Sequence, residues 1–316
     1  MDALPLEEAN DVPYKSQNKG VMHACGHDGH TAILLTTASV LAQYKDAIKG
    51  NVKFVFQPAE EFGGGEGGAL PMVQEGVLEE PKVDAAIGLH LWSLRPTGKI
   101  AVRDGGFMAG QGELRAVIKG RGGHGALPHQ TVDPIVASAQ FITALQTLVS
   151  REVPALKSAV VSICTIHGGT AFNIIPDEVV LKGTFRYYDE EVRDTLIERI
   201  EGILKGITSA LNTKYELRCR SDCPPVLNDK GMVKFIKKVA SSVVGEGNVE
   251  LGEPIMGADD VSEFLLRVPG CYFFLGAGSP ERGFDHPHHS PDFDIDEEAL
   301  PVGVVVFCRA ALEYLS

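Results

Sequence analysis

The segment MHACGHDGH at residues 22–30 constrains this chain more than any other stretch. It gathers Cys25, His27 and Asp28, with His23 and His30 on its flanks. A hydrophobic core does not accept so many polar groups together, because each buried one must find a partner. Thiolate, imidazole and carboxylate groups are ligands of divalent metals such as zinc. The segment therefore predicts a loop around a metal ion, with a polar turn carrying surface histidines as the alternative.

The pattern of apolar residues predicts a larger α/β domain that is interrupted by a smaller one. Helices are expected at 30–44, 69–75, 230–244, 259–267 and 297–315, and strands of a largely parallel sheet at 51–57, 83–89 and 271–275. In the interrupting part, strands are expected at 113–119, 159–167, 178–187 and 214–219, and helices at 134–150 and 190–211. That order, β-α-β-β-α-β, is the ferredoxin-like arrangement. We therefore expect one domain formed by residues 1–110 and 223–316, with residues 111–222 inserted into it.

Charge and cysteine content exclude several classes of protein. With 29 basic and 42 acidic residues the net charge is −13, which argues against nucleic acid or an anionic membrane surface as main partner. No apolar run approaches the roughly 18 residues of a membrane span, and the acidic N-terminus does not resemble a signal peptide. Six scattered cysteines indicate a reducing compartment, here the cytoplasm. Cys219 and Cys223 are expected to be free thiols, because no second pair matches them.

Two of the expected strands lead directly to polar side chains. Strand 51–57 is followed by Glu60 and Glu61, and strand 83–89 by His90. In open α/β sheets, ligands bind beyond the carboxyl ends of the strands, so these side chains are expected at one edge. One glutamate can bind a metal while its neighbour takes a proton from water that the metal activates. A solvated acidic loop is the alternative.

Three further features are candidates for binding. The segment DHPHHS at 285–290 follows strand 271–275 and can reach the same edge, although histidines in such loops are often surface residues. His124 lies in a glycine-rich turn. Asn173 precedes the expected strand 178–187, and Arg186 lies near the end of that strand. An arginine there would suit a substrate carboxylate through its bidentate fork. A turn asparagine and a surface arginine are the alternatives.

The motifs MHACGHD, QPAEE, GLH and HHSP occur in the order found in the zinc-dependent amidohydrolases of the aminoacylase and carboxypeptidase clan. The whole chain resembles this family, which includes hippurate hydrolase, auxin-conjugate (indole-3-acetyl-amino-acid) hydrolases and thermostable carboxypeptidase. The resemblance implies a zinc-peptidase-like catalytic domain with an inserted ferredoxin-like lid and dimerisation domain. It also implies that related chains carry a further segment before MDALP, so that part of the catalytic domain is expected to be missing here.

The resemblance implies a specific metal site. Two divalent ions, zinc or else Mn, Co or Ni, would be held by Cys25, His27, Glu61, His90 and His289. Cys25 would bridge the ions. His289 is preferred to His288 as the ligand because it adjoins the Ser-Pro pair.

The remaining roles are also implied by the resemblance. Glu60 would be the general base and acid, and Asp2 would support the site from behind. His124 would polarise the scissile carbonyl, often from the partner subunit of a homodimer. Asn173 and Arg186 would hold the carbonyl and the carboxylate of the substrate.

The expected function is metal-dependent hydrolysis of an N-acyl amino acid or of a related amide or short peptide. A thiol hydrolase with Cys25 as nucleophile is one alternative, but it leaves the Glu60–Glu61 pair and the C-terminal histidines unexplained. A non-catalytic binding protein, or an inactive homologue lacking its N-terminal part, is the other. Metal content would separate the hydrolases from one another.

Overall fold

The computed structural model describes residues 2–62 and 68–316 and divides into two compact units. Unit 1 comprises Met1–Phe107, Val226–Pro254 and Asp260–Ser316, and unit 2 comprises Met108–Pro225 and Ile255–Asp259. The sequence pattern had suggested boundaries at 110/111 and 222/223, and it had not suggested that 255–259 joins the second unit. Within the described residues, no helix combines the length and the apolar character that crossing a membrane requires.

Unit 1 is built on a mixed four-stranded sheet with the order β1-β12-β2-β11. Its strands are β1 (Ala86–Pro96), β12 (Gly270–Gly278), β2 (Ile100–Val102) and β11 (Val249–Leu251). β1 and β12 are parallel, as are β2 and β11, whereas β12 and β2 are antiparallel. β3 (Gly105–Met108) and β10 (Val226–Asn228) form a separate pair. The short strands β2 and β11 have too few residues for a periodic signal, so the sequence pattern does not predict them.

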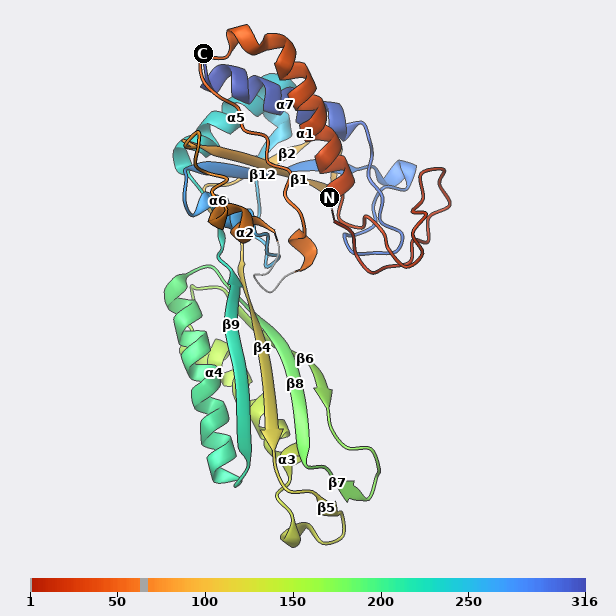
Figure 1. Cartoon of the computed structure of the whole chain (residues 1–316), viewed down its shortest axis with the longest axis vertical. Helices are drawn as coiled ribbons and strands as arrows, with labels where there is room; N and C mark the ends of the chain where they lie inside the picture. Colours follow the sequence, from red (N-terminus) through yellow and green to blue (C-terminus); the bar gives the residue numbers. More distant parts are fainter. Residues whose placement is uncertain (1, 63–67) are drawn as a thin grey trace. The chain divides into compact units, whose positions relative to one another are not determined.

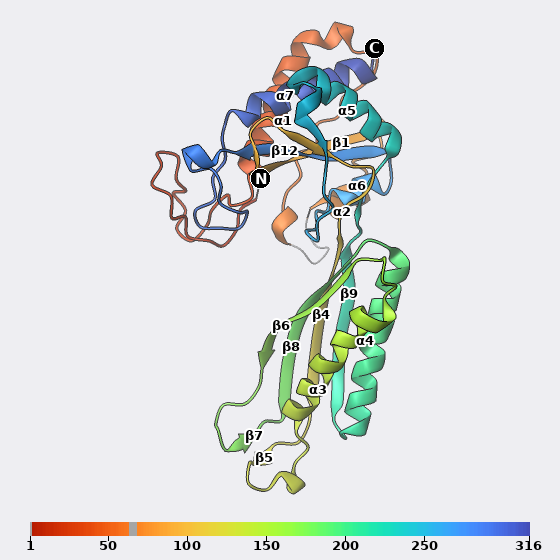
Figure 2. The same cartoon turned by 180° about the vertical axis from the view of Figure 1, so that it is seen from behind.

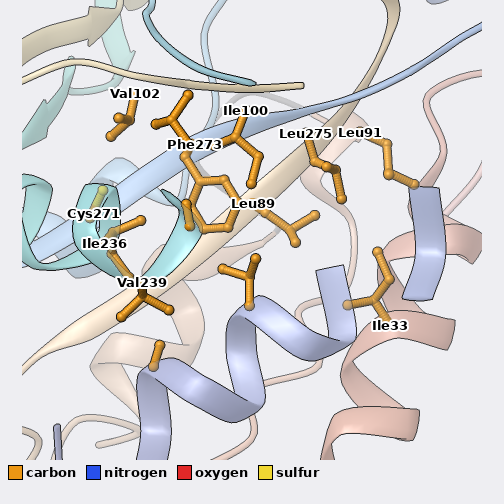
Figure 3. Packing of buried hydrophobic residues seen from close by; sticks show 14 of the residues in the cluster. Ile33, Leu89, Leu91, Ile100, Val102, Ile236, Val239, Cys271, Phe273 and Leu275 are labelled. Carbon is orange, nitrogen blue, oxygen red and sulfur yellow. The ribbon is translucent and has the colours of Figure 1, made fainter. Parts of the chain in front are cut away.

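Helices cover both faces of this sheet. Figure 1 shows α1 (His27–Leu41), α5 (Lys230–Val244) and α7 (Ala299–Tyr314) on one face, and α2 (Ala69–Gln74) and α6 (Ser262–Leu265) on the other. The apolar side of α5 repeats at helical spacing through Met232, Ile236, Val239 and Ala240, all buried. Together with residues of β1, β2, β12, α1 and α7 these side chains form the main core of the unit (Figure 3).

Three predicted elements of unit 1 differ in the structure. Residues 51–57 do not form a strand. The alternation of apolar residues predicts an extended segment, but a strand also needs a neighbouring strand to share its hydrogen bonds, and alternation does not predict that neighbour. The strand expected at 83–89 is β1, which begins later and continues to Pro96 since its pairing with β12 continues. His90 therefore lies inside a strand and not beyond its end. Of the helix expected at 259–267, only Ser262–Leu265 is α-helical.

Unit 2 contains an antiparallel sheet with the order β6-β8-β4-β9, and Figure 2 shows two helices on one of its faces. The elements are β4 (Gly110–Lys119), α3 (Pro134–Thr147), β6 (Ala159–His167), β8 (Glu178–Tyr187), α4 (Glu190–Ala210) and β9 (Lys214–Cys223). Asp133 caps α3 by accepting from the N–H groups of Ile135 and Val136. The small pair β5 (Gly123–His124) and β7 (Ile174–Ile175) lies beyond the end of the main sheet. The side chains between sheet and helices form a second core, separate from that of unit 1.

Candidate metal centre

The cysteine and the first histidine of the site lie at the start of α1. Gly26 adopts a left-handed conformation, with φ of 79°, and allows the chain to turn directly from Cys25 into the helix. The sequence pattern had suggested a loop that continued to residue 30, but His27 is already the first residue of the helix. Asp28 points to solvent in the first turn, where a negative charge favours the helix dipole, so it does not join the cluster.

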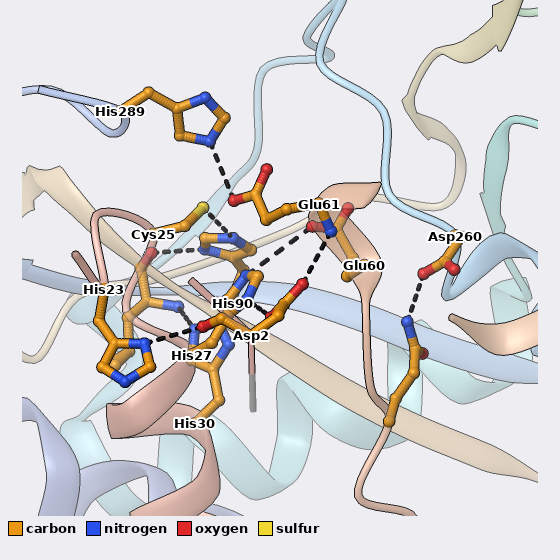
Figure 4. A network of polar contacts seen from close by, with 12 residues as sticks. Asp2, His23, Cys25, His27, His30, Glu60, Glu61, His90, Asp260 and His289 are labelled. Carbon is orange, nitrogen blue, oxygen red and sulfur yellow. Dashed lines mark hydrogen bonds and ion pairs between the residues drawn. The ribbon is translucent and has the colours of Figure 1, made fainter. Parts of the chain in front are cut away.

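Two imidazoles are held so that the same nitrogen of each ring faces the site (Figure 4). The Nδ1 of His90 lies 2.6 Å from the backbone oxygen of Leu91, which can only accept, so this nitrogen carries the proton. The Nδ1 of His27 likewise faces the carboxylate of Asp2. The Nε2 lone pairs are thereby left for the site, and that of His90 lies 3.5 Å from the Sγ of Cys25.

The two glutamates lie on a single turn at Glu60–Phe62, and the second of them is fixed by its backbone. The N–H of Glu61 donates to the second oxygen of Asp2, at 2.8 Å. The side chain of Glu61 then lies 3.1 Å from the Nε2 of His289, and that of Glu60 lies 3.8 Å from the Nε2 of His27. Asp2 therefore holds one histidine and one glutamate at the same time.

The C-terminal histidine reaches the cluster because its loop is tied to the first one. The N–H of His289 donates to the backbone oxygen of Ala24 at 2.8 Å, directly before Cys25. The neighbouring His288 turns the other way, and its ring packs among Trp92, His90 and Phe293. Burial lowers the pKa of His288 to about 3. Of the two histidines, it is His289 that lies beside Glu61.

The local fields favour charged carboxylates at this site. Burial opposes ionisation of Asp2, but the hydrogen bonds from the Glu61 N–H and from His27 hold the pKa of its carboxyl below the ordinary value. Burial also opposes ionisation of Glu61, and contact with His289 and Cys25 lowers its pKa in net terms. The same contact with Glu61 raises the pKa of His289. The site thus holds negative charge that a cation can neutralise.

The ligand atoms fall into two groups that share one sulfur. Cys25, His27 and His90 bring a thiol and two imidazoles to within 4.8 Å of one another. Cys25, Glu61 and His289 bring the same thiol, a carboxylate and one imidazole equally close together. Among the described residues, the Oε1 of Glu61 is buried without a hydrogen bond of regular geometry. A sulfur, nitrogen and oxygen donor set with a buried acceptor facing inward fits a divalent metal. The shared Cys25 fits two ions.

The candidate residues of unit 2 lie at its two ends. His124 and Asn173 are both exposed and adjacent, because the N–H of Gly125 donates to the backbone oxygen of Asn173 at 2.8 Å. The strand pair β5–β7 beside them is tied to Asp177, before β8 begins, because the N–H of Gly122 donates to the Asp177 carboxylate at 2.8 Å. Arg186 lies near the far end of β8, on the face opposite the core. The eight residue steps of strand from Glu178 to Arg186 span about 27 Å.

One side-chain nitrogen of Arg186, Nη1, is buried and makes no hydrogen bond to the described residues. Burial lowers the pKa of the guanidinium, while Cys223, Asp222 and Cys164 act in the opposite direction. Its neighbours Phe185 and Tyr187 are fully buried in the core of unit 2, so the side chain of Arg186 faces the other side of the sheet.

Three residues near the metal cluster were not assigned roles from the sequence. His30 is half-buried behind the site, where its Nε2 accepts from the N–H of Leu91 at 2.9 Å. Asp260 and Gln57 form a side-chain hydrogen bond beside the glutamate turn. His30 stood within the histidine-rich motif, but the Asp260–Gln57 contact joins residues far apart in the chain and leaves no local pattern.

Comparison with known proteins adds the relatives of the chain. The sequence pattern of Peptidase family M20/M25/M40 matches residues 1–313. The chain is 41% identical over 315 residues to thermostable carboxypeptidase 2 of Saccharolobus solfataricus, covering 99% of this chain and 79% of the relative. It is 39% identical over 300 residues to N-acetyl-L-cysteine deacetylase of Bacillus subtilis, covering 95% and 69%.

A plant relative and a solved structure extend this comparison. The IAA-amino acid hydrolase ILR1-like 4 of Arabidopsis thaliana is 40% identical over 319 residues, covering 100% of this chain and 71% of the relative. The crystal structure of the Bacillus subtilis YXEP protein, a dinuclear metal-binding peptidase from the M20 family, aligns with a TM-score of 0.81 at 33% identity. That alignment covers 99% of this chain and 79% of the other.

Proposed function

Because the chain belongs to Peptidase family M20/M25/M40 and is an enzyme acting on amide or peptide bonds, we propose that it removes the acyl group from N-acyl amino acids. The observation that carries this proposal is the pair of ligand groups sharing Cys25, with Glu60 beside them. The substrate class is supported by relatives named as an amino-acid-conjugate hydrolase and an N-acetyl-amino-acid deacetylase.

We assign the ligands as Cys25, His27, Glu61, His90 and His289, for two divalent ions of which zinc is the first candidate. Bound ions would supply Lewis-acid polarisation of the substrate carbonyl and a water molecule of lowered pKa. Asp2 fixes the ring of His27 and the backbone of Glu61, and so preserves the spacing between the ligand groups. Since Cys25 must stay a thiol in this role, we place the enzyme in a reducing compartment, the cytoplasm.

Glu60 is the proton carrier in this proposal. Its carboxylate lies beside the ligand groups, 3.8 Å from the Nε2 of His27. A carboxylate in that position can accept the proton of the attacking water and return it to the leaving amine. No covalent intermediate with the protein is needed.

We propose that unit 2 supplies the substrate contacts and that the enzyme is a homodimer. The part of β8 between the β5–β7 end of the sheet and Arg186 extends about 27 Å, further than one small N-acyl amino acid extends. One copy of unit 2 therefore cannot place all three on the same substrate molecule. If His124 and Asn173 polarise the carbonyl while Arg186 binds the carboxylate, two copies must contribute to each site, with unit 2 as the lid and dimerisation domain.

A thiol hydrolase remains a second candidate because Cys25 lies 3.5 Å from the Nε2 of His90. A cysteine beside an imidazole can act as a nucleophile. The two candidates differ in their response to chelation. A thiol enzyme would keep its activity when all metal is removed, whereas the proposed amidohydrolase would lose it and regain it with added metal.

The experiment that tests the proposal changes the two glutamates separately. Glu60→Gln should keep its metal content yet lose about 100-fold or more in kcat, the usual scale of general acid–base catalysis. Glu61→Ala should instead lose metal, as measured by elemental analysis. Glu75→Gln, at an exposed glutamate that ends α2, is the matched control and should retain both. Near-normal turnover of Glu60→Gln with its metals in place would rule out the assigned role.

A further inference from the structure

The segment that carries Glu60 and Glu61 is held at both ends by one carboxylate. Asp260, distant in sequence, accepts from the side-chain amide of Gln57 just before this segment (Figure 4). Its other oxygen accepts from the N–H of Ala69 at 2.8 Å, where the described chain resumes and α2 begins. A single side chain therefore joins the two ends of a stretch that includes both glutamates.

A neighbouring glycine gives independent evidence that this contact is built into the fold. Gly68 has φ of 75°, which favours glycine, and a Cβ at this position would lie 1.7 Å from the Oδ2 of Asp260. No other residue would leave room for the carboxylate. The close approach allows Asp260 to satisfy the first backbone N–H of α2, which has no partner within its own helix.

We infer that Asp260 is a positioning residue for Glu60 and Glu61. Asp2 fixes the segment at the backbone of Glu61, and Asp260 fixes its ends, so two carboxylates restrain the turn from different sides. The inference rests on the roles proposed for the two glutamates. Asp260 acts through its hydrogen bonds with Gln57 and Ala69, and one of its carboxylate oxygens also lies within 4.8 Å of a carboxylate oxygen of Glu60.

The first measurement is a series of variants at this one position. Asp260→Asn keeps one acceptor oxygen and so loses one of the two hydrogen bonds, whereas Asp260→Ala loses both. We expect kcat and metal affinity to fall about tenfold or more in Asp260→Ala, as for other partners that orient metal ligands, with Asp260→Asn in between. KM should change little. Hydrogen exchange at the Ala69 amide should become faster in the same order, which reports on the contact without any activity assay.

Asp229→Ala is the matched control for lost stability. Asp229 is also a carboxylate of unit 1 that accepts from a backbone N–H at a helix start, from Met232 at 2.8 Å. Within the part of the chain that the structure describes, Asp229 contacts neither the glutamate turn nor the metal cluster. Its loss should therefore lower the melting temperature while kcat and metal affinity stay unchanged. An equal loss of kcat in Asp229→Ala would show that the effect at Asp260 is only general destabilisation, and would overturn the inference.

The glycine offers a second, independent test. Gly68→Ala should resemble Asp260→Ala, because the new Cβ displaces the carboxylate. Its effect should be smaller in an Asp260→Ala background, where the colliding oxygen is gone, so the two changes should be non-additive. Fully additive effects, or unchanged Ala69 exchange in Asp260→Ala, would contradict the inference.

The outcomes also separate this inference from the proposed function. Faster exchange at Ala69 and weaker metal binding in Asp260→Ala, with no loss of kcat in Glu60→Gln, would overturn the proton-transfer role alone. A loss of kcat in Glu60→Gln without any effect of Asp260→Ala would overturn the positioning role alone.

Discussion

The metal cluster of unit 1 and the candidate substrate contacts of unit 2 differ in how completely one chain assembles them. In unit 1, side chains from four separate segments lie within contact distance and hold one another in place through Asp2 and the backbone of Ala24. In unit 2, His124 and Asn173 lie at one end of the sheet and Arg186 at the other. The candidate metal ligands therefore lie together in one chain, whereas the candidate substrate contacts lie apart.

The difference indicates which part of the reaction depends on a second chain. In the proposed mechanism, metal binding and proton transfer use only residues that unit 1 gathers. The proposed recognition of a substrate by residues from both ends of unit 2 would need a second copy of the chain, as a symmetric dimer would provide. Mixing a chain altered in unit 1 with a chain altered in unit 2 should therefore restore activity, because a mixed dimer can combine the intact region of each chain.

The largest effect is expected for His124 and tests the shared site directly. His124→Ala should lose about 100-fold or more in kcat, the scale for removing one group that stabilises an oxyanion. Mixing it with Glu60→Gln chains should restore about a quarter of wild-type activity, because half of the dimers are mixed and each has one intact site. No recovery, with mixed dimers shown to form by differently tagged chains, would contradict sharing between subunits.

Arg186 should show a smaller effect that depends on substrate charge. A charge-assisted hydrogen bond contributes about 1.5–3 kcal/mol, or roughly tenfold to a hundredfold in kcat/KM. The wild type should prefer an N-acyl amino acid over its carboxamide by that factor, and Arg186→Ala should erase most of the preference. Lys182→Ala, on the same strand and face but exposed, is the control. A preference that survives in Arg186→Ala would mean that another group reads the carboxylate.

Asp2 should influence metal affinity without being a ligand. Asp2→Asn keeps an oxygen for the Glu61 N–H but loses the charge that faces His27. We expect metal affinity to fall by about 10- to 100-fold, measured by competition with a chelator of known affinity. Asp28→Asn, an exposed carboxylate in the first turn of the same helix, should bind metal as the wild type does. Equal losses in both would indicate a general effect of charge and not a specific contact.

The sequence predicted those parts of the molecule that leave a local pattern. Long helices such as α4 and α5 and the strands of unit 2 follow from periodicity, and Cys25 and His27 stand within one dense motif. The pattern failed at 51–57, because pairing depends on a partner elsewhere in the chain. It also missed Asp260, whose two hydrogen bonds reach residues about 200 positions away. The separation between Arg186 and the end of unit 2 that carries His124 likewise does not follow from the sequence pattern, because it depends on the length and register of β8.

The strand order of unit 1 has a consequence for the synthesis of the protein. β12 pairs with both β1 and β2, although it is made long after them, and the loop that follows it carries His289. Among the residues that the structure describes, β12 is the neighbour of β1 in the sheet, so β1 lacks this partner until β12 leaves the ribosome. Cys25, His27 and His90 are present on the growing chain, but the scaffold that gathers them is not. Tight capture of metal is therefore expected only near the end of translation, when the last part of the sheet has folded.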